Sequence, residues 1–347
     1  MSSTSSPHAT VALVAMASTA AAIAVVSCWQ RLSSAKMQLD LRDPDAMLKL
    51  CAQRMLKVSP PRQSQFRVYA ILTWEHKAKH TSGWVSGTNS ESAYIGGSLC
   101  AERAAAVQLR ELPVGTNVTG IYLISDLENS CITPGVLCRE YLLSCAHPDT
   151  PVHLGSRDLR ITRATSLREL YPCRCVYEGI PRDRIIDEAE RIARLQQQAQ
   201  SESLFDGALN SDAWEALVKM AMEVVKNDRF GGQMHPVQYA AAMEFADGTT
   251  DVAWQKAGLE YGTSVDSVTA LLHQVDHKGA PVRLVQVDQF GVLHAPFAPA
   301  RAQLYERGCG DTKVATFDAD TEIVTVTTVN KLVPDCPSMG ELWPKCC

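Results

Sequence analysis

The order of helix and strand signals in the first half of the chain recurs in the second half, and this repetition constrains the fold most. In the first half a helical pattern opens at Asp43-Pro44, strand formers fill residues 66–74, and a loop at 87–98 leads into a helical run. The second half repeats helix 213–226, strands 237–246 and 250–256, helix 264–275 and strand 282–287. Strands that alternate with helices indicate layered α/β folds. We therefore predict a duplicated three-layer α/β fold, with a mixed sheet flanked by helices in each copy.

The chain has 347 residues, which favours more than one domain. We predict the following segments: an N-terminal segment 1–40, a first body 41–180, a charged and Gln-rich linker helix 181–211, a second body 212–335 and a tail 336–347.

Composition excludes some functions. The net charge is −5 and aromatic residues make up 6% of the chain, so it offers neither a broad basic field nor many rings for stacking bases. A nucleic-acid polymer is therefore not expected as a partner. Twelve cysteines in so long a chain do not make a disulfide scaffold. Six of them lie between residues 100 and 175, which favours a reducing compartment with thiols kept for chemistry.

The N-terminal segment carries no Lys, Arg, Asp or Glu before Arg31. Residues 9–27 form a charge-free stretch close to the ~20 residues that span a bilayer. Positive charge after this stretch would leave the body on the cytoplasmic side. We predict a membrane anchor or an organelle-targeting segment, with a disordered extension as the alternative. The terminal Cys346-Cys347 pair is either a lipid acceptor or two thiols on a frayed tail.

Two short segments of the first body carry chemistry-bearing residues. Cys100 and Glu102 open one predicted helix, and Cys138 lies at the start of the next, after Pro134. A helix N-terminus favours the thiolate form of cysteine. Thiolates that hold Zn²⁺, beside a free carboxylate that moves protons, are what a metal-assisted hydrolase needs.

These segments resemble the cytidine deaminase family. Residues 87–94 (GTNSESAY) are similar to that family's substrate loop, and residues 100–105 (CAERAA) to its Cys-Ala-Glu-Arg motif. Residues 133–140 (TPGVLCRE) resemble its second zinc motif, and Ser59-Pro60 with residues 66–68 resembles its opening strand. The similarity covers residues 43–165 well and residues 212–305 faintly.

The resemblance implies a function and its residues. The chain would be a zinc-dependent hydrolase that converts cytidine or deoxycytidine to uridine or deoxyuridine in pyrimidine salvage. Cys100 and Cys138 would bind zinc, and Glu102 would be the general acid and base. Asn89 and Glu91 would hold the ribose hydroxyls, so the substrate would be a free pyrimidine nucleoside. The family also implies a homodimer.

One position departs from the family's pattern. The second motif of the family is Pro-Cys-x-x-Cys, and Gly135 replaces its first cysteine here. Cys131, in the preceding loop, is the candidate replacement ligand, ahead of Cys145 and His147. Two hypotheses remain: a working cytidine deaminase, or a catalytically impaired deaminase-like protein that acts as a binding or assembly partner.

The second body lacks this ligand pattern. Asp266 stands where the first cysteine belongs, Val268 where the glutamate belongs, and residues 296–301 (PFAPAR) replace the second motif. Two-domain members of the family carry such a degenerate repeat, which helps to close the active site in a homodimer. The chain therefore resembles that two-domain form, and zinc is expected in the first body only.

Overall fold

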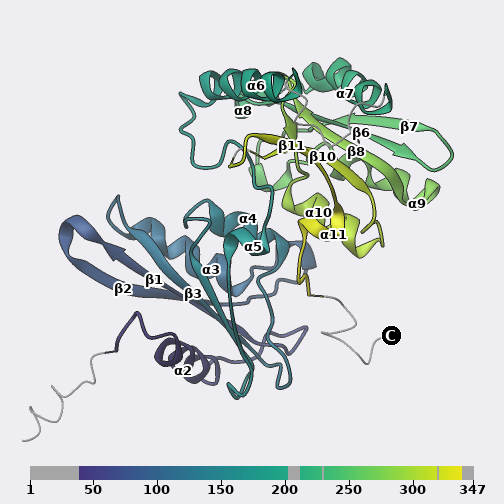
Figure 1. Ribbon diagram of the computed structural model, residues 1–347. Helices are drawn as coiled ribbons and strands as arrows, with labels where there is room; N and C mark the ends of the chain where they lie inside the picture. Colours follow the sequence, from purple (N-terminus) through teal and green to yellow (C-terminus); the bar gives the residue numbers. More distant parts are fainter. Residues whose placement is uncertain (1–38, 202–211, 229, 319, 338–347) are drawn as a thin grey trace, which may run out of the picture. The chain divides into compact units, whose positions relative to one another are not determined.

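The computed structural model describes residues 39–201, 212–228, 230–318 and 320–337 (Figure 1). The candidate anchor at residues 9–27 and the candidate lipid site at Cys346-Cys347 lie outside these ranges. Within them, no helix combines the length and the hydropathy that crossing a membrane requires. The described residues from Leu48 onward belong to one compact unit, and residues 39–47 belong to another. In the smaller unit, Asp43 caps the start of a helix by accepting the backbone N–H of Asp45 at 3.0 Å.

The first body contains a five-stranded sheet with the order β2-β1-β3-β4-β5, in which only β3 and β4 run parallel. Its strands are β1 (Val68–His76), β2 (Thr81–Thr88), β3 (Asn117–Ser125), β4 (Pro151–Gly155) and β5 (Thr162–Ser166). Its helices are α2 (Pro44–Met55), α3 (Ala101–Gln108), α4 (Val136–Leu143) and α5 (Leu167–Leu170).

The two faces of this sheet are covered by different helices (Figure 1). On one face, Ala101 and Ala105 of α3 and Leu142 of α4 are buried against Leu72 and Leu123 of the sheet. On the other face, Cys51 of α2 donates its thiol to the carbonyl of Tyr69 at 3.3 Å. The first turns of α3 and α4 therefore lie on the same side of the sheet.

The second body repeats this topology. Its sheet has the order β11-β10-β8-β6-β7, and β9 pairs with β8. Its strands are β6 (Tyr239–Phe245), β7 (Thr250–Trp254), β8 (Pro281–Asp288), β9 (Leu293–His294), β10 (Lys313–Asp318) and β11 (Ile323–Thr328). Its helices are α6 (Ile185–Ser201), α7 (Asp212–Val224), α8 (Gly231–Met234), α9 (Leu272–Lys278), α10 (Ala298–Glu306) and α11 (Val329–Leu332).

The predicted fold class, mixed α/β with helices on the sheets, is confirmed. Across the second sheet the strands lie in the order β7-β6-β8-β10-β11, which matches β2-β1-β3-β4-β5 of the first sheet strand by strand. Only β8 and β10 run parallel, as only β3 and β4 do in the first sheet. This shared order supports the duplication. The helix predicted as a linker, α6, buries Ile185, Ala189 and Ile192 in the core of the second body.

The secondary structure of the second body differs from the prediction in two places. The helix expected at 264–275 begins only at Thr269, as a short 3-10 turn before α9. The carboxylate of Asp266 accepts the backbone N–H groups of Val268 and Thr269 at 3.0 and 2.9 Å, as an N-cap does, and caps the turn that precedes this 3-10 segment. Strands β10 and β11 and helix α10 lie in a segment where no strand or helix was predicted.

Gly87 explains how closely α3 approaches the sheet. A Cβ atom at Gly87 would lie 2.4 Å from the carbonyl oxygen of Ala101 and 2.5 Å from the backbone nitrogen of Ala105. Both are backbone atoms, so no side-chain rotation can relieve the overlap. The absent side chain of Gly87 therefore sets the position of the helix that carries Cys100 and Glu102.

We predict that Gly87→Ala lowers the free energy of unfolding by about 1–3 kcal/mol, because α3 must shift away from β2. Urea unfolding followed by circular dichroism measures the loss. Gly262→Ala is the matched control, because a Cβ there meets nothing within 4 Å. Equal stability of the two variants would contradict this account of the helix position.

Candidate metal centre

Cys100 is the residue that precedes the first turn of α3. It is the N-cap, with extended backbone angles of φ −73° and ψ 155°. An isolated bridge between Ser90 and Leu99 joins the segment before α3 to the loop that follows β2. Glu102, in the first turn, is only 3% exposed. The cysteine and the carboxylate are thus held on one short, well-anchored turn.

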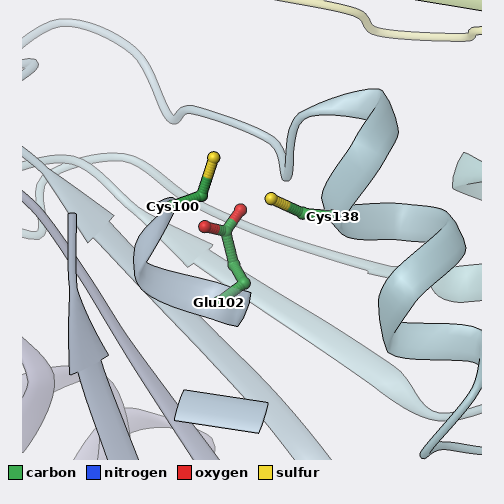
Figure 2. Close-up of side chains that lie close together, drawn as sticks. All are labelled: Cys100, Glu102 and Cys138. Carbon is green, nitrogen blue, oxygen red and sulfur yellow. The ribbon is translucent and has the colours of Figure 1, made fainter. Parts of the chain in front are cut away.

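Cys138 comes from α4, whose N-cap is Gly135. The carbonyl of Gly135 accepts the backbone N–H groups of Cys138 at 2.8 Å and Arg139 at 3.0 Å. The Cys138 side chain is fully buried. Figure 2 shows its sulfur pointing toward Cys100 and Glu102, which come from the start of α3.

These three side chains form a compact group of metal-ligand type. The two sulfurs and a carboxylate oxygen all lie within 4.8 Å of one another. In the part of the chain that the structure describes, no other set of three or more His, Cys, Asp or Glu side chains meets this condition. Two thiols and a carboxylate suit a zinc ion, which prefers sulfur and nitrogen and accepts oxygen.

The protonation of the group follows from its burial and its hydrogen bonds. The Cys138 thiol donates a hydrogen bond to the Cys100 sulfur. This hydrogen bond and the positive charge of Arg103 lower the pKa of Cys100 to about 6, although burial alone would raise it. Its role as donor in that bond, together with burial, raises the pKa of Cys138 well above its ordinary value. Burial, followed by the negative charge of Cys100, raises the pKa of Glu102 to about 7.

Arg103 is the cation beside this group. Its guanidinium lies 3.7 Å from the Cys100 sulfur and donates to the carbonyl of Ser98 at 3.3 Å. Only one of the two thiols is therefore readily ionised without metal, and a bound divalent cation would favour ionisation of the other.

The missing cysteine leaves open space. A Cβ atom at Gly135 would meet nothing within 4 Å. Its φ of −60° suits any residue, so glycine is not required by the backbone. A longer side chain at this position can therefore be accommodated without a steric clash.

Cys131, the predicted replacement ligand, is not part of the three-residue group. Its thiol donates to the carbonyl of Ile161 at 3.3 Å and lines a pocket of about 150 Å³ with Thr133 and Arg163. Cys145 donates to the carbonyl of Leu142 at 3.3 Å within its own helix end. His147 is exposed, and its Nδ1 accepts the backbone N–H of Asp149 at 3.2 Å.

Asn89 and Glu91, predicted to hold the ribose, bind the segment that leads into β1. The Asn89 amide accepts the N–H of Val68 and donates to the carbonyl of Phe66, both at 2.8 Å. One Glu91 oxygen accepts the N–H groups of Gln63 at 3.0 Å and Ser64 at 2.9 Å. Both side chains therefore fix the loop after β2, and their ribose-binding role stays a prediction.

The corresponding positions of the second body have other uses. Asp266 caps a turn, and Val268 is fully buried in an apolar cluster with Leu271 and Leu272. Phe297 is the N-cap of α10, as Gly135 is of α4. Ala300 is buried where Cys138 would be expected.

Sequence reasoning assigned no role to Arg139, which is fully buried beside Cys138. Its guanidinium donates to the carbonyls of Pro134 at 2.7 Å and Leu170 at 2.7 Å, within the first body. It also donates to the carbonyls of Pro334 at 2.6 Å and Asp335 at 3.0 Å, which follow α11 of the second body. The start of α4 is thus tied to the end of the second body.

Arg301 repeats this arrangement in the opposite direction. It donates to Pro296 at 2.6 Å in its own body, and to Pro172 at 2.8 Å and Cys173 at 2.5 Å at the end of the first body. The sequence signal was present, because a proline precedes each arginine by five residues in both bodies. Only the structure shows that the two arginines exchange partners.

Comparison with models of known protein families finds no match. Solved structures with some similarity include cytidine deaminases from three bacteria. That from Burkholderia pseudomallei is 23% identical, covers 37% of this chain and 97% of its own, and has a TM-score of 0.32. That from Mycobacterium leprae is 20% identical, covers 36% and 99%, and scores 0.30. That from Mycobacterium tuberculosis is 19% identical, covers 37% and 99%, and scores 0.32.

We predict that Arg139→Met lowers the free energy of unfolding by at least about 3 kcal/mol, because several buried carbonyls lose their donor at once. Guanidinium chloride unfolding measures the change. Arg160→Met, at a largely exposed arginine, is the matched control and should leave stability unchanged. If Arg139→Met is as stable as the wild type, the hydrogen bonds that Arg139 makes to the two bodies contribute nothing to the free energy of unfolding.

Proposed function

We propose that the first body is a zinc-dependent hydrolase that deaminates free cytidine or deoxycytidine to uridine or deoxyuridine. The observation that carries the proposal is the group formed by Cys100, Glu102 and Cys138, whose ligand atoms lie within 4.8 Å of one another. The two sulfurs would hold the metal. Bound zinc lowers the pKa of a water molecule, which makes a nucleophile available near neutral pH.

Glu102 is the residue that would move protons. Its carboxylate is buried beside both sulfurs, where it can accept a proton from the attacking water. It would then deliver a proton to the ring nitrogen N3, and a later one to the departing amine. Water thus supplies the oxygen of the product, and ammonia leaves. Arg103 would offset the negative charge of Cys100 during these steps.

Asn89 and Glu91 differ in what they can offer to a ribose. The side-chain amide of Asn89 contacts the main chain with both of its polar atoms, so it is better suited to orienting the loop. Glu91 is half-buried, and a carboxylate has about four acceptor positions. Its contacts with Gln63 and Ser64 use only part of this capacity. We propose Glu91 as the acceptor for a ribose hydroxyl.

Gly135 supports a second candidate function. If two thiols cannot hold zinc alone, Glu102 is the remaining donor in the group and would be used as a ligand. The proton carrier would then be lost, and the chain would act as a binding or assembly partner. The homodimer, the role in pyrimidine salvage and the location on the cytoplasmic side belong to the proposal as further expectations.

We predict that Glu102→Gln reduces cytidine deamination by at least roughly 10²–10⁴-fold while zinc content is unchanged, because the amide cannot carry the proton. Ammonia release and metal analysis of the full-length protein measure the two effects. Glu111→Gln, at an exposed residue beyond α3, is the matched control. Loss of zinc in Glu102→Gln would instead identify the carboxylate as a ligand.

We predict that Gly135→Cys raises both zinc affinity and the rate of deamination, because a third thiolate enters open space at the start of α4. Gly135→Ser fills the same space without a sulfur and is the matched control. Competition with a chelator measures affinity. If Cys131 already completes the site, Cys131→Ser releases zinc and Gly135→Cys changes little, which would contradict the open-site interpretation.

A further inference from the structure

A cavity of about 430 Å³ is lined by residues of the second body and by the segment 175–185 that leads into it. The backbone N–H of Gln255 donates to the carbonyl of Tyr239 at 2.8 Å, as that of Asn89 donates to Val68 at 3.3 Å. The Lys256–Val265 bridge repeats the Ser90–Leu99 bridge. Gln255 thus corresponds to Asn89, and it lines the cavity together with Tyr239 and Phe297.

The apolar lining of the cavity includes Ile180 and Ile185 as well as aromatic rings. The rings of Tyr239 and Phe297 lie with their centroids 4.9 Å apart and their planes at 89°. They form a corner in which a flat ligand can meet the face of one ring and the edge of the other. The cavity is within the usual size range of small-molecule sites, roughly 300–1,000 Å³.

The polar part of the lining selects against anions. The side chains of Gln255, Glu178 and His235 line the cavity, and no Lys or Arg is among the described residues that do. A carboxamide offers a donor and an acceptor side by side, which matches a ligand edge with the complementary pair. An acidic neighbour and the absence of a basic side chain disfavour a phosphorylated ligand.

A buried polar cluster supports the wall behind the cavity. The carboxylate of Asp288 accepts hydrogen bonds from the hydroxyl of Tyr177 and, at 2.9 Å, from Nε2 of His294. Asp288 and His294 are 0% and 2% exposed. The ring of His294 lies edge-on to Tyr239 with centroids 5.1 Å apart. Such a cluster restricts the aromatic side chains, and His294 Nδ1 has no partner among the described residues.

We propose that this cavity binds an uncharged planar heterocycle that carries a hydrogen-bond donor and acceptor side by side, as a nucleobase does. Gln255 pairs with that edge, and Tyr239 and Phe297 hold the ring. The ligand is bound and not converted, because the corresponding catalytic positions hold Asp266, used as a cap, and the apolar Val268. The proposal does not rest on activity in the first body.

The test uses uridine and adenosine as probes, because both combine a sugar with a base edge of this kind. Equilibrium dialysis measures their binding to the full-length chain and to Gln255→Leu. Gln303→Leu, on α10 and outside the cavity, is the matched control. We expect Gln255→Leu to weaken one binding event by at least about tenfold, because a buried pair of hydrogen bonds is lost. Uridine 5′-monophosphate should bind there more weakly than uridine.

Hydrogen–deuterium exchange locates the ligand independently of any variant. Bound nucleoside should slow exchange in residues 176–180, 235–239 and 254–256, which line or adjoin the cavity. The segments around Cys100 and Cys138 serve as an internal reference, because a ligand confined to the candidate metal centre slows exchange there instead. The proposal is overturned if neither nucleoside changes exchange in the three segments, or if wild type and Gln255→Leu bind both probes equally.

Discussion

The conformation of the loop before α4, and with it the position of Cys138, depends on the buried guanidinium of Arg139. A buried N–H without an acceptor is costly, and Arg139 donates to carbonyls from both bodies as well as to the hydroxyl of Thr133. Arg301 does the same in reverse, through Pro172 and Cys173. Neither loop before α4 or α10 can therefore reach its final conformation alone. Because Cys138 adjoins Arg139, the second body helps to position a candidate metal ligand.

The metal centre is a second consequence of burial. Three groups that can each carry negative charge share a small volume beside the cation Arg103. Without metal, this arrangement lowers the pKa of Cys100 and raises those of Cys138 and Glu102, so that part of the negative charge is neutralised by protons. A divalent cation would replace those protons. The open space at Gly135 leaves the remaining coordination positions to water, substrate or another ligand.

The two bodies show how one framework supports different sites. Bridges, strand order and the buried arginine are shared, whereas the residues that face the cavity have diverged. Phe297 stands at the helix cap where the first body has Gly135, and Val268 joins the apolar core where the first body has Glu102. The carboxamide of Asn89 is kept as Gln255, whereas Asp266, Val268 and Ala300 stand where the first body has Cys100, Glu102 and Cys138. This exchange favours recognition of a neutral ring over metal chemistry.

The sequence by itself determined the α/β class, the duplication and the proximity of Cys100 to Glu102, because these follow from hydrophobic periodicity and from spacing within one helical turn. The late start of α9 was not predicted, because Asp266 caps a turn at the expected place and the chain then forms a short 3-10 turn before α9. The resemblance predicted that Cys138 joins Cys100, but only the tertiary structure left Cys131 outside their group and exchanged the arginine partners. Such contacts join residues far apart in the chain, and their geometry is decided by how helices pack on the sheets.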